Sequence, residues 1–349
     1  MQDTISGIDL FCGAGGLTHG LLLEGLQVIA GIDNDEDCRY PYEANNSPAK
    51  FIESDIKNIP SAEISTILKD AQHTFIAGCA PCQPFSTYSR RYTDAIHADK
   101  WFLLTEFERI VQDCSPTIVA MENVPSLIKH DVFSNFQNKL QDTGYHVWHE
   151  IVNCIEYGVP QKRKRIVLLA SKLGQISLDK IMDNESLTVR HSISQLPTLE
   201  AGCQSLEDPL HISAGLSPIN LERIKQSTQG GTWRDWPKDL IVRCHMEHTG
   251  RSYGSVYGRM EWDKPAPTIT TQCFGFGNGR FGHPEQNRAL SLREAALLQS
   301  FPITYKFVRN RETVNMSTIG RLIGNAVPVN LGRAIGRSIK QHLKEHSLT

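Results

Sequence analysis

The sequence has no long hydrophobic run, since no stretch approaches the roughly 18 consecutive apolar residues of a membrane span. Its N-terminus, MQDTISGIDLF, lacks the positive start and apolar core of a signal peptide. Neither sign of charge dominates, because 36 Lys and Arg stand against 38 Asp and Glu. The nine cysteines lack the dense, regular spacing of a secreted disulfide scaffold. We therefore expect a cytoplasmic protein with reduced thiols, and any nucleic-acid partner requires a local basic surface.

The first half of the chain has the pattern of a doubly wound α/β sheet. Its 349 residues suffice for two domains or for one large domain with an insertion. Residues 5–170 alternate short apolar runs with amphipathic stretches, as βα units around a mostly parallel sheet do. The predicted strands are residues 7–11, 27–33, 51–56, 74–78, 117–123, 146–153 and 165–170, and the clearest helices are 17–26 and 100–113.

The pattern changes after about Ser171. Residues 172–286 are punctuated by Pro, Gly, Ser, Trp and Arg, which predicts an inserted or second domain rich in loops. The stretch SLREAALLQSFP then predicts a helix, with Ser291 as its N-cap and Glu294 at the capping-box distance. We therefore predict three segments, 1–171, 172–286 and 287–349, of which the last returns to the first domain.

Three successive predicted strands end in residues suited to a cofactor. DLFCGAGG places a glycine turn directly before a helix, where main-chain amides can receive an anionic group, although its spacing is not G-x-G-x-x-G. Asp33 ends the second strand, where a carboxylate commonly accepts both ribose hydroxyls, and Asp55 ends the third. This combination favours an adenosine-containing cofactor over three unrelated solvated strand ends.

Cys79 and Cys82 form a C-x-x-C pair in the stretch CAPCQPFS. The pair fits a redox dithiol, half of a zinc site, a coincidence or a nucleophile. Zinc would need two further ligands at matching spacing, and a dithiol would be expected in a small thioredoxin-like domain. A strand-to-loop turn with prolines around Cys82 suits a nucleophile at the carboxyl edge of the sheet. Glu122, which ends the next strand, could hold a base while Cys82 adds to its ring.

These motifs together resemble those of the DNA (cytosine-5) methyltransferases, of the bacterial restriction-modification type. The matching segments are DLFCGAGG, APCQPFS, MENV, QKRKR, REAALLQSFP and IGNAVPVNLGRAI, in the order and spacing of the family. The resemblance implies a Rossmann-like S-adenosylmethionine-dependent methyltransferase sheet with a smaller, loop-rich target recognition domain at 172–286. It also implies methyl transfer to carbon 5 of a flipped-out cytosine in duplex DNA, through a Cys82 adduct at carbon 6.

The resemblance assigns roles position by position. Cys82 is similar to the family nucleophile, Glu122 to the acid that grips the base, and Arg165 to the contact for the cytosine carbonyl, with Arg163 in support. The implied cofactor-binding residues are Phe11, Gly13, Gly15, Gly16, Asp33, Asn34, Asp55, Ile56, Asn325 and Val327. The implied DNA contacts are Ala80 through its carbonyl, Ser86, Arg90, Arg91, Thr268, Arg251, Arg259 and Arg280. For the arginines, an ordinary solvated surface is the alternative; Trp233, Trp236 and Trp262 are predicted core residues.

The resemblance also predicts the partners. They are double-stranded DNA and, where the enzyme protects its host in a restriction-modification system, a cognate restriction endonuclease encoded nearby; a related defence system or an unpaired methyltransferase are the alternatives. We expect a monomeric enzyme, no metal and no membrane. Cys244, His245 and His248 could suggest a metal, but we expect them to be satisfied polar residues. The alternatives are a family member that methylates transfer RNA, a binding protein that has lost catalysis, and an NAD-dependent dehydrogenase. The last leaves Cys82 and Glu122 unexplained.

Overall fold

The structure is a computed structural model that describes residues 5–81, 98–180, 187–247, 250–309 and 313–346. The chain forms two compact units, each with a hydrophobic cluster of its own. Unit 1 comprises residues 1–157, 164–182 and 327–349, and unit 2 comprises residues 158–163 and 183–326.

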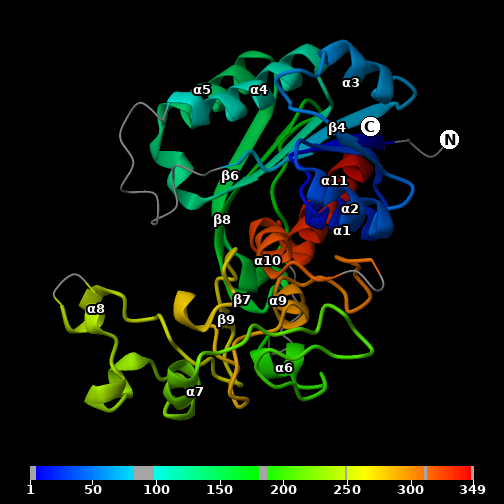
Figure 1. Ribbon diagram of the computed structural model, residues 1–349. Coiled ribbons are helices and arrows are strands. Elements are labelled where there is room, and N and C mark those ends of the chain that lie inside the picture. The colour runs from blue at the N-terminus through cyan, green and yellow to red at the C-terminus, as the bar shows by residue number, and fades with distance from the viewer. Residues whose placement is uncertain (1–4, 82–97, 181–186, 248–249, 310–312, 347–349) are drawn as a thin grey trace. The chain divides into compact units, whose positions relative to one another are not determined.

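Unit 1 is built on a seven-stranded sheet in the order β3-β2-β1-β4-β5-β8-β6 (Figure 1). Neighbouring strands are parallel except that β8 runs antiparallel to both β5 and β6. The strands are β1 (Ile5–Leu10), β2 (Gln27–Asp33), β3 (Lys50–Glu53), β4 (His73–Gly78), β5 (Ile118–Asn123), β6 (His146–Asn153) and β8 (Lys164–Ser171). This confirms the predicted doubly wound sheet and each of its seven predicted strands.

Helices cover both faces of this sheet (Figure 1). On one face lie α1 (Gly16–Leu23), α2 (Arg39–Asn45) and α11 (Val329–His346), and on the other lie α3 (Ser61–Leu68), α4 (Ala98–Cys114) and α5 (Asp131–Asp142). Because both faces are covered, the central strands read as continuous apolar runs, and Ile76 and Val119 are fully buried. Helices α1 and α11 approach closely at Gly20, where an added Cβ would lie 2.5 Å from the carbonyl oxygen of Val329.

Unit 2 is largely irregular, as the sequence predicted for most of it. Its helices include α6 (Val189–Ile193), α7 (Pro218–Lys225), α8 (Arg243–Met246), α9 (Leu292–Leu298) and α10 (Met316–Asn325). A short parallel pair joins β7 (Gln161–Lys162) to β9 (Ala266–Pro267). Trp233 and Trp236 lie in its hydrophobic cluster with Phe276, and Trp262 is also buried, so the three tryptophans are core residues as predicted.

The units differ from the predicted segments in three places: residues 158–163 and 287–326 group with unit 2, and residues 172–182 group with unit 1. For residues 287–326 the physical reason is a set of polar contacts with the loop that precedes α7. The Arg293 guanidinium pairs with Asp208 at 2.5 Å, and His211 Nδ1 lies 2.9 Å from Ser291 Oγ. Ser291 also caps α9, with the reciprocal Glu294 bond of the predicted capping box.

Candidate active site

The turn between β1 and α1 has a backbone geometry that favours glycine. Gly13 and Gly15 have positive φ angles of 53° and 88°, and Gly15 is the N-cap of α1. Phe11 also has a positive φ, of 60°, which is rare for a bulky residue and marks a constrained position. A Cβ added at Gly13 would meet no atom within 4 Å. The main-chain amides around Gly16 can therefore receive an anionic group of a ligand.

Asp33 holds this turn from the neighbouring strand. Its Oδ2 accepts a hydrogen bond from the Gly13 amide at 2.9 Å, and its Oδ1 accepts one from the Asp35 amide at 3.1 Å. Burial raises the pKa of Asp33, while these main-chain donors act in the opposite direction. The sequence predicted Asp33 as a ribose acceptor but not its bond to Gly13, which depends on the pairing of β1 with β2. Asn34, which follows, is exposed.

Asp55 and Ile56 lie in the loop after β3 rather than at the strand end, because β3 already ends at Glu53. Ile56 is buried in the hydrophobic core, and Asp55 Oδ1 accepts from the Lys57 amide at 3.1 Å. Arg109 of α4 fixes the loop by donating to the carbonyl oxygen of Ile56 at 3.1 Å. Since β1, β2 and β3 are adjacent and parallel, the glycine turn, Asp33 and this loop all follow strand ends on one edge of the sheet.

Asp9 is a buried acid beneath the glycine turn that the sequence analysis did not single out. Its side chain is 1% exposed and accepts a hydrogen bond from Thr18 Oγ1 at 2.7 Å. Thr18 is in turn 3.1 Å from the Tyr42 hydroxyl. Burial raises the pKa of Asp9 to about 7, despite the opposing Thr18 bond. An acid inside an otherwise apolar strand was the sequence signal that could have revealed it.

Glu122 lies near the end of β5 and is almost fully buried, at 2% exposure. Its Oε1 is 2.8 Å from Nε of Arg165, an ion pair that lacks the angle of a hydrogen bond. Arg165 stands near the start of β8, and because β8 is antiparallel to β5 that start lies beside the end of β5. The structure therefore brings together two of the predicted catalytic residues, from segments that are more than forty residues apart in sequence.

The loop after β4 meets the same carboxylate through Cys79. The Cys79 thiol donates a hydrogen bond to Glu122 Oε2 at 2.9 Å. The next carbonyl, of the buried Ala80, accepts from the Asn123 side-chain amide at 3.1 Å. In the sequence Cys79 stands out only as half of a C-x-x-C pair, which does not predict this contact. Four predicted residues further along the chain lie outside the described residues, namely Cys82, Ser86, Arg90 and Arg91.

The QKRKR stretch alternates in exposure along the chain. Lys162 and Lys164 are exposed, whereas Arg163 is buried and Arg165 is half-buried. Within unit 2, Arg163 donates to the carbonyl oxygens of Ile269, Gly324 and Ala326 at 3.0, 3.3 and 3.4 Å. Thr268 is fixed to the same stretch, because its Oγ1 donates to the Lys162 carbonyl at 2.6 Å. Asn325 is exposed at the end of α10 in unit 2, and Val327 is buried in unit 1.

The three arginines predicted as DNA contacts in unit 2 have different surroundings. Arg251 is exposed, and Arg280 is half-buried with its guanidinium bonded to the carbonyl of Gly230. Arg259 is only 4% exposed, and its donors bind carbonyl or amide oxygens of Ser227, His283, Gln286, Ile224 and Asn287 at 2.7 to 2.9 Å. In this structure Arg259 therefore joins loops of unit 2, and we do not retain it as a DNA contact.

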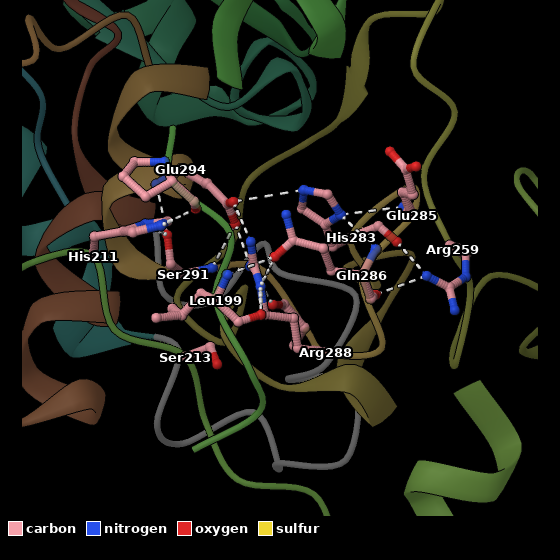
Figure 2. Close-up of polar contacts among 12 residues, drawn as sticks. Leu199, His211, Ser213, Arg259, His283, Glu285, Gln286, Arg288, Ser291 and Glu294 are labelled. Atoms are coloured by element: carbon pink, nitrogen blue, oxygen red, sulfur yellow. Dashed lines mark hydrogen bonds and ion pairs between the residues drawn. The ribbon is translucent and has the colours of Figure 1, made fainter. Parts of the chain in front are cut away.

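A buried polar cluster links the end of the irregular region to α9 (Figure 2). Arg288, which is fully buried, donates to both carboxylate oxygens of Glu294 at 2.7 and 2.6 Å. Burial alone would raise the pKa of Glu294, but the Arg288 bonds and charge lower it overall. His283 Nδ1 accepts from the amides of Glu285 and Gln286, so its proton is on Nε2; burial lowers the pKa of His283 to about 4.

In the described parts of the chain, no three His, Cys, Asp or Glu side chains gather as a metal site would require. His245 instead stacks on Trp233, with ring centroids 4.5 Å apart, and lies 3.0 Å from the Gly250 carbonyl. Its neighbour His248 lies outside the described residues. Within the same described parts, no helix is both long and apolar enough to cross a membrane.

Solved structures identify the class of fold. A prophage-encoded candidate DNA modification methyltransferase of Escherichia coli superposes with a TM-score of 0.74 and 21% identity, covering 98% of this chain and 100% of that one. Dnmt2 methyltransferase of S. pombe superposes with a TM-score of 0.59 and 16% identity, covering 97% and 98%. The chain therefore has the S-adenosylmethionine-dependent methyltransferase fold.

Sequence comparison identifies the family within that fold. The model of C-5 cytosine-specific DNA methylases matches residues 5–341. The Type II methylase M.HgiDII of Herpetosiphon aurantiacus is 52% identical over 342 residues, covering 97% of this chain and 95% of that protein. The Type II methyltransferase M1.BsuMI of Bacillus subtilis is 31% identical, covering 94% and 79%. The chain thus belongs to the C-5 cytosine-specific DNA methylases and is a DNA cytosine-5 methyltransferase.

Proposed function

We propose that this enzyme methylates carbon 5 of a flipped-out cytosine at a specific site in duplex DNA, with S-adenosylmethionine as methyl donor. The observation that carries the proposal is the buried Glu122 carboxylate, paired with Arg165 one strand away from the loop that leads to Cys82. The similarity to Type II methyltransferases supports a role in host protection beside a cognate restriction endonuclease.

The residues of unit 1 supply a complete path for activating the base. The Cys82 thiolate adds to carbon 6 of cytosine, while a proton shared between Glu122 and the ring nitrogen offsets the developing charge and Glu122 accepts from the amino group. Arg165 contacts the carbonyl oxygen, and the Ala80 carbonyl, which also accepts from Asn123, accepts from the amino group. Addition makes carbon 5 nucleophilic; after methylation a base takes the carbon 5 proton, its bonding electrons re-form the ring double bond, and Cys82 leaves as a thiolate. Arg163 is proposed to support this stretch of chain.

The edge of the sheet formed by β1, β2 and β3 fits S-adenosylmethionine. The open space beside Gly13 at the start of α1 suits the charged end of the cofactor, and Asp33 suits the ribose. Phe11 would pack against the adenine, which Asp55 and Ile56 would also meet. Gly15, Gly16, Asn34, Asn325 and Val327 remain predicted contacts. When bound, this cofactor supplies an electrophilic methyl group on a sulfonium.

Duplex DNA hides the reacting atoms, so the base must leave the helix at a cost of a few kcal/mol. Contacts to the strand would offset that cost, and Ser86, Arg90 and Arg91 are the predicted residues next to Cys82. Thr268 would hold a phosphate near the flipped nucleotide. Arg251 and Arg280 are proposed contacts of unit 2 with the major groove or the phosphates.

The test measures transfer of tritium from methyl-labelled S-adenosylmethionine to unmethylated genomic DNA and, separately, to a transfer-RNA pool. Wild type is compared with Cys82→Ala and with the matched control Cys203→Ala, whose cysteine is exposed in unit 2. Methylated cytosines are then mapped at single-base resolution. We expect label in one short DNA context with wild type and Cys203→Ala, and none with Cys82→Ala.

Other outcomes would replace the proposal. Label in RNA alone would assign the enzyme to a transfer-RNA substrate. Full DNA methylation by Cys82→Ala would exclude the covalent mechanism. Binding of DNA without label in either nucleic acid would indicate a binding protein that has lost catalysis.

A further inference from the structure

We propose that Cys79 is a positioning residue that fixes the orientation of the Glu122 carboxylate for the base. The inference rests on the proposed role of Glu122 and extends it to a residue of the preceding strand connection. The inference is based on the hydrogen bond that the Cys79 thiol donates to Glu122 Oε2 at 2.9 Å.

The Glu122 carboxylate needs such a partner. The last side-chain torsion of Glu122 joins a tetrahedral carbon to the planar carboxylate carbon, and such a torsion has no sharply preferred angle. The orientation of the carboxylate therefore depends on its neighbours. Arg165 approaches Oε1 at 2.8 Å but without the angle of a hydrogen bond. Among the described residues, the Cys79 bond to Oε2 is therefore the directional contact of this carboxylate, and a donor to a buried, charged oxygen counts for more than one in water.

The backbone at Cys79 is fixed independently of its side chain. The Cys79 amide donates to the Leu10 carbonyl at 3.3 Å, which continues the pairing of β4 with β1. The preceding Gly78 packs so closely that an added Cβ would lie 2.5 Å from the same carbonyl oxygen. The thiol is thus presented to Glu122 by a rigid strand end, and its removal leaves that strand in place.

Cys79 is also half-buried, unlike the fully buried cysteines of unit 1 such as Cys154. A cysteine that only filled the core would need no donor bond to a carboxylate. The geometry therefore explains why a thiol stands here: it is small enough for the strand end and can still donate a hydrogen bond.

The experiment compares steady-state methylation by wild type, Cys79→Ala, Cys79→Ser and the control Cys114→Ala. Cys114 is a half-buried cysteine of α4 whose thiol also donates, to the Ser61 carbonyl at 3.5 Å, away from the site. We expect Cys79→Ala to lower kcat on the order of ten-fold, the loss typical of one hydrogen bond to a charged group. KM for S-adenosylmethionine should stay at its wild-type value, because it does not depend on the Glu122 orientation.

Two comparisons separate positioning from a merely structural role. Cys79→Ser keeps a donor and should retain kcat within about three-fold of wild type, since a hydroxyl can replace the thiol. In a Glu122→Ala background, Cys79→Ala should cause no further loss, because its effect passes through the carboxylate. Additive losses, wild-type activity of Cys79→Ala or equal losses in the Ala and Ser variants would each overturn the inference.

The outcomes also distinguish this inference from the proposed function. Wild-type activity in Glu122→Ala would remove the proposed role of Glu122 itself. A strong loss in Glu122→Ala beside an unaffected Cys79→Ala would leave the proposed function intact and reject only the role of Cys79.

Discussion

The buried pair of Arg288 and Glu294 should make unit 2 sensitive to a change of one atom. Glu294→Gln keeps the size of the side chain but removes the negative charge opposite a guanidinium that is fully buried. The helix cap itself should survive, because Gln can replace Glu in a capping box at Ser291. The cost therefore comes from the uncompensated charge of Arg288 and from the loss of one of two short hydrogen bonds.

The magnitude follows from the burial of both partners. Removing one member of a buried ion pair costs about 3–5 kcal/mol. For a unit of roughly 150 residues, such a loss lowers the thermal midpoint on the order of 10 °C. Because Arg288 lowers the pKa of Glu294, the contribution of the carboxylate is present above its ordinary pKa of 4.5 and is lost as the pH falls below it. Wild type and variant should therefore converge at acid pH.

Tryptophan fluorescence during thermal and denaturant unfolding is a suitable assay. Three of the five tryptophans belong to unit 2, and Trp262 packs edge-on against His283 at 5.1 Å within the polar cluster. Glu285→Gln is the matched control, because Glu285 is exposed and its substitution should change stability by less than about 0.5 kcal/mol. A double variant, Arg288→Met with Glu294→Gln, should recover part of the loss. A Glu294→Gln protein as stable as the control, or a double variant with fully additive losses, would refute this reasoning.

Three further predictions concern titration and the cofactor. The pKa of His283 is lowered to about 4, so its stabilising contribution is present above pH 6.5 and is lost on acidification. In urea melts, the free energy of unfolding of wild type should fall between pH 7 and pH 4.5 by up to roughly 3 kcal/mol more than that of His283→Asn. An unchanged pH dependence would contradict the burial of a neutral imidazole. The pKa of Asp9 is raised to about 7, so wild type should lose stability relative to Asp9→Asn as the pH rises from 4 to 8, by up to about 4 kcal/mol. Parallel stability curves would show that Asp9 ionises normally. Asp33→Ala removes both the proposed ribose acceptor and the bond to Gly13, and calorimetry should show S-adenosylmethionine binding weakened on the order of a hundred-fold, with Asp35→Ala as the milder control. Equal affinities in the two variants would reject the role of Asp33.

The sequence predicted the strands well because most of them are short apolar runs bounded by turn residues, a pattern typical of buried strands. It also predicted that Glu122 and Arg165 serve one site. It could not predict the bonds of Cys79 to Glu122 or of Asp33 to Gly13, since these depend on which strands become neighbours and on side-chain rotamers. Arg259 shows the same limit. In the sequence, an arginine among glycines and aromatics can equally belong to a loop that reads a DNA groove or be buried and bind main-chain carbonyls, as Arg259 does.

The reversed direction of β8 has a consequence for how this chain tolerates insertions. Arg165 reaches Glu122 only because β8 pairs with β5 in one register, with Val167 opposite Glu122 and Ile166 opposite Asn123. A slip of one residue in a strand turns every side chain to the other face. One residue added or deleted just before Lys164 that shifted this pairing would therefore point the guanidinium away from the carboxylate while leaving the arginine in the sequence. The length of the chain between Tyr157 and Lys164, where it leaves unit 1 and returns, is thus as much a requirement for the site as the arginine itself.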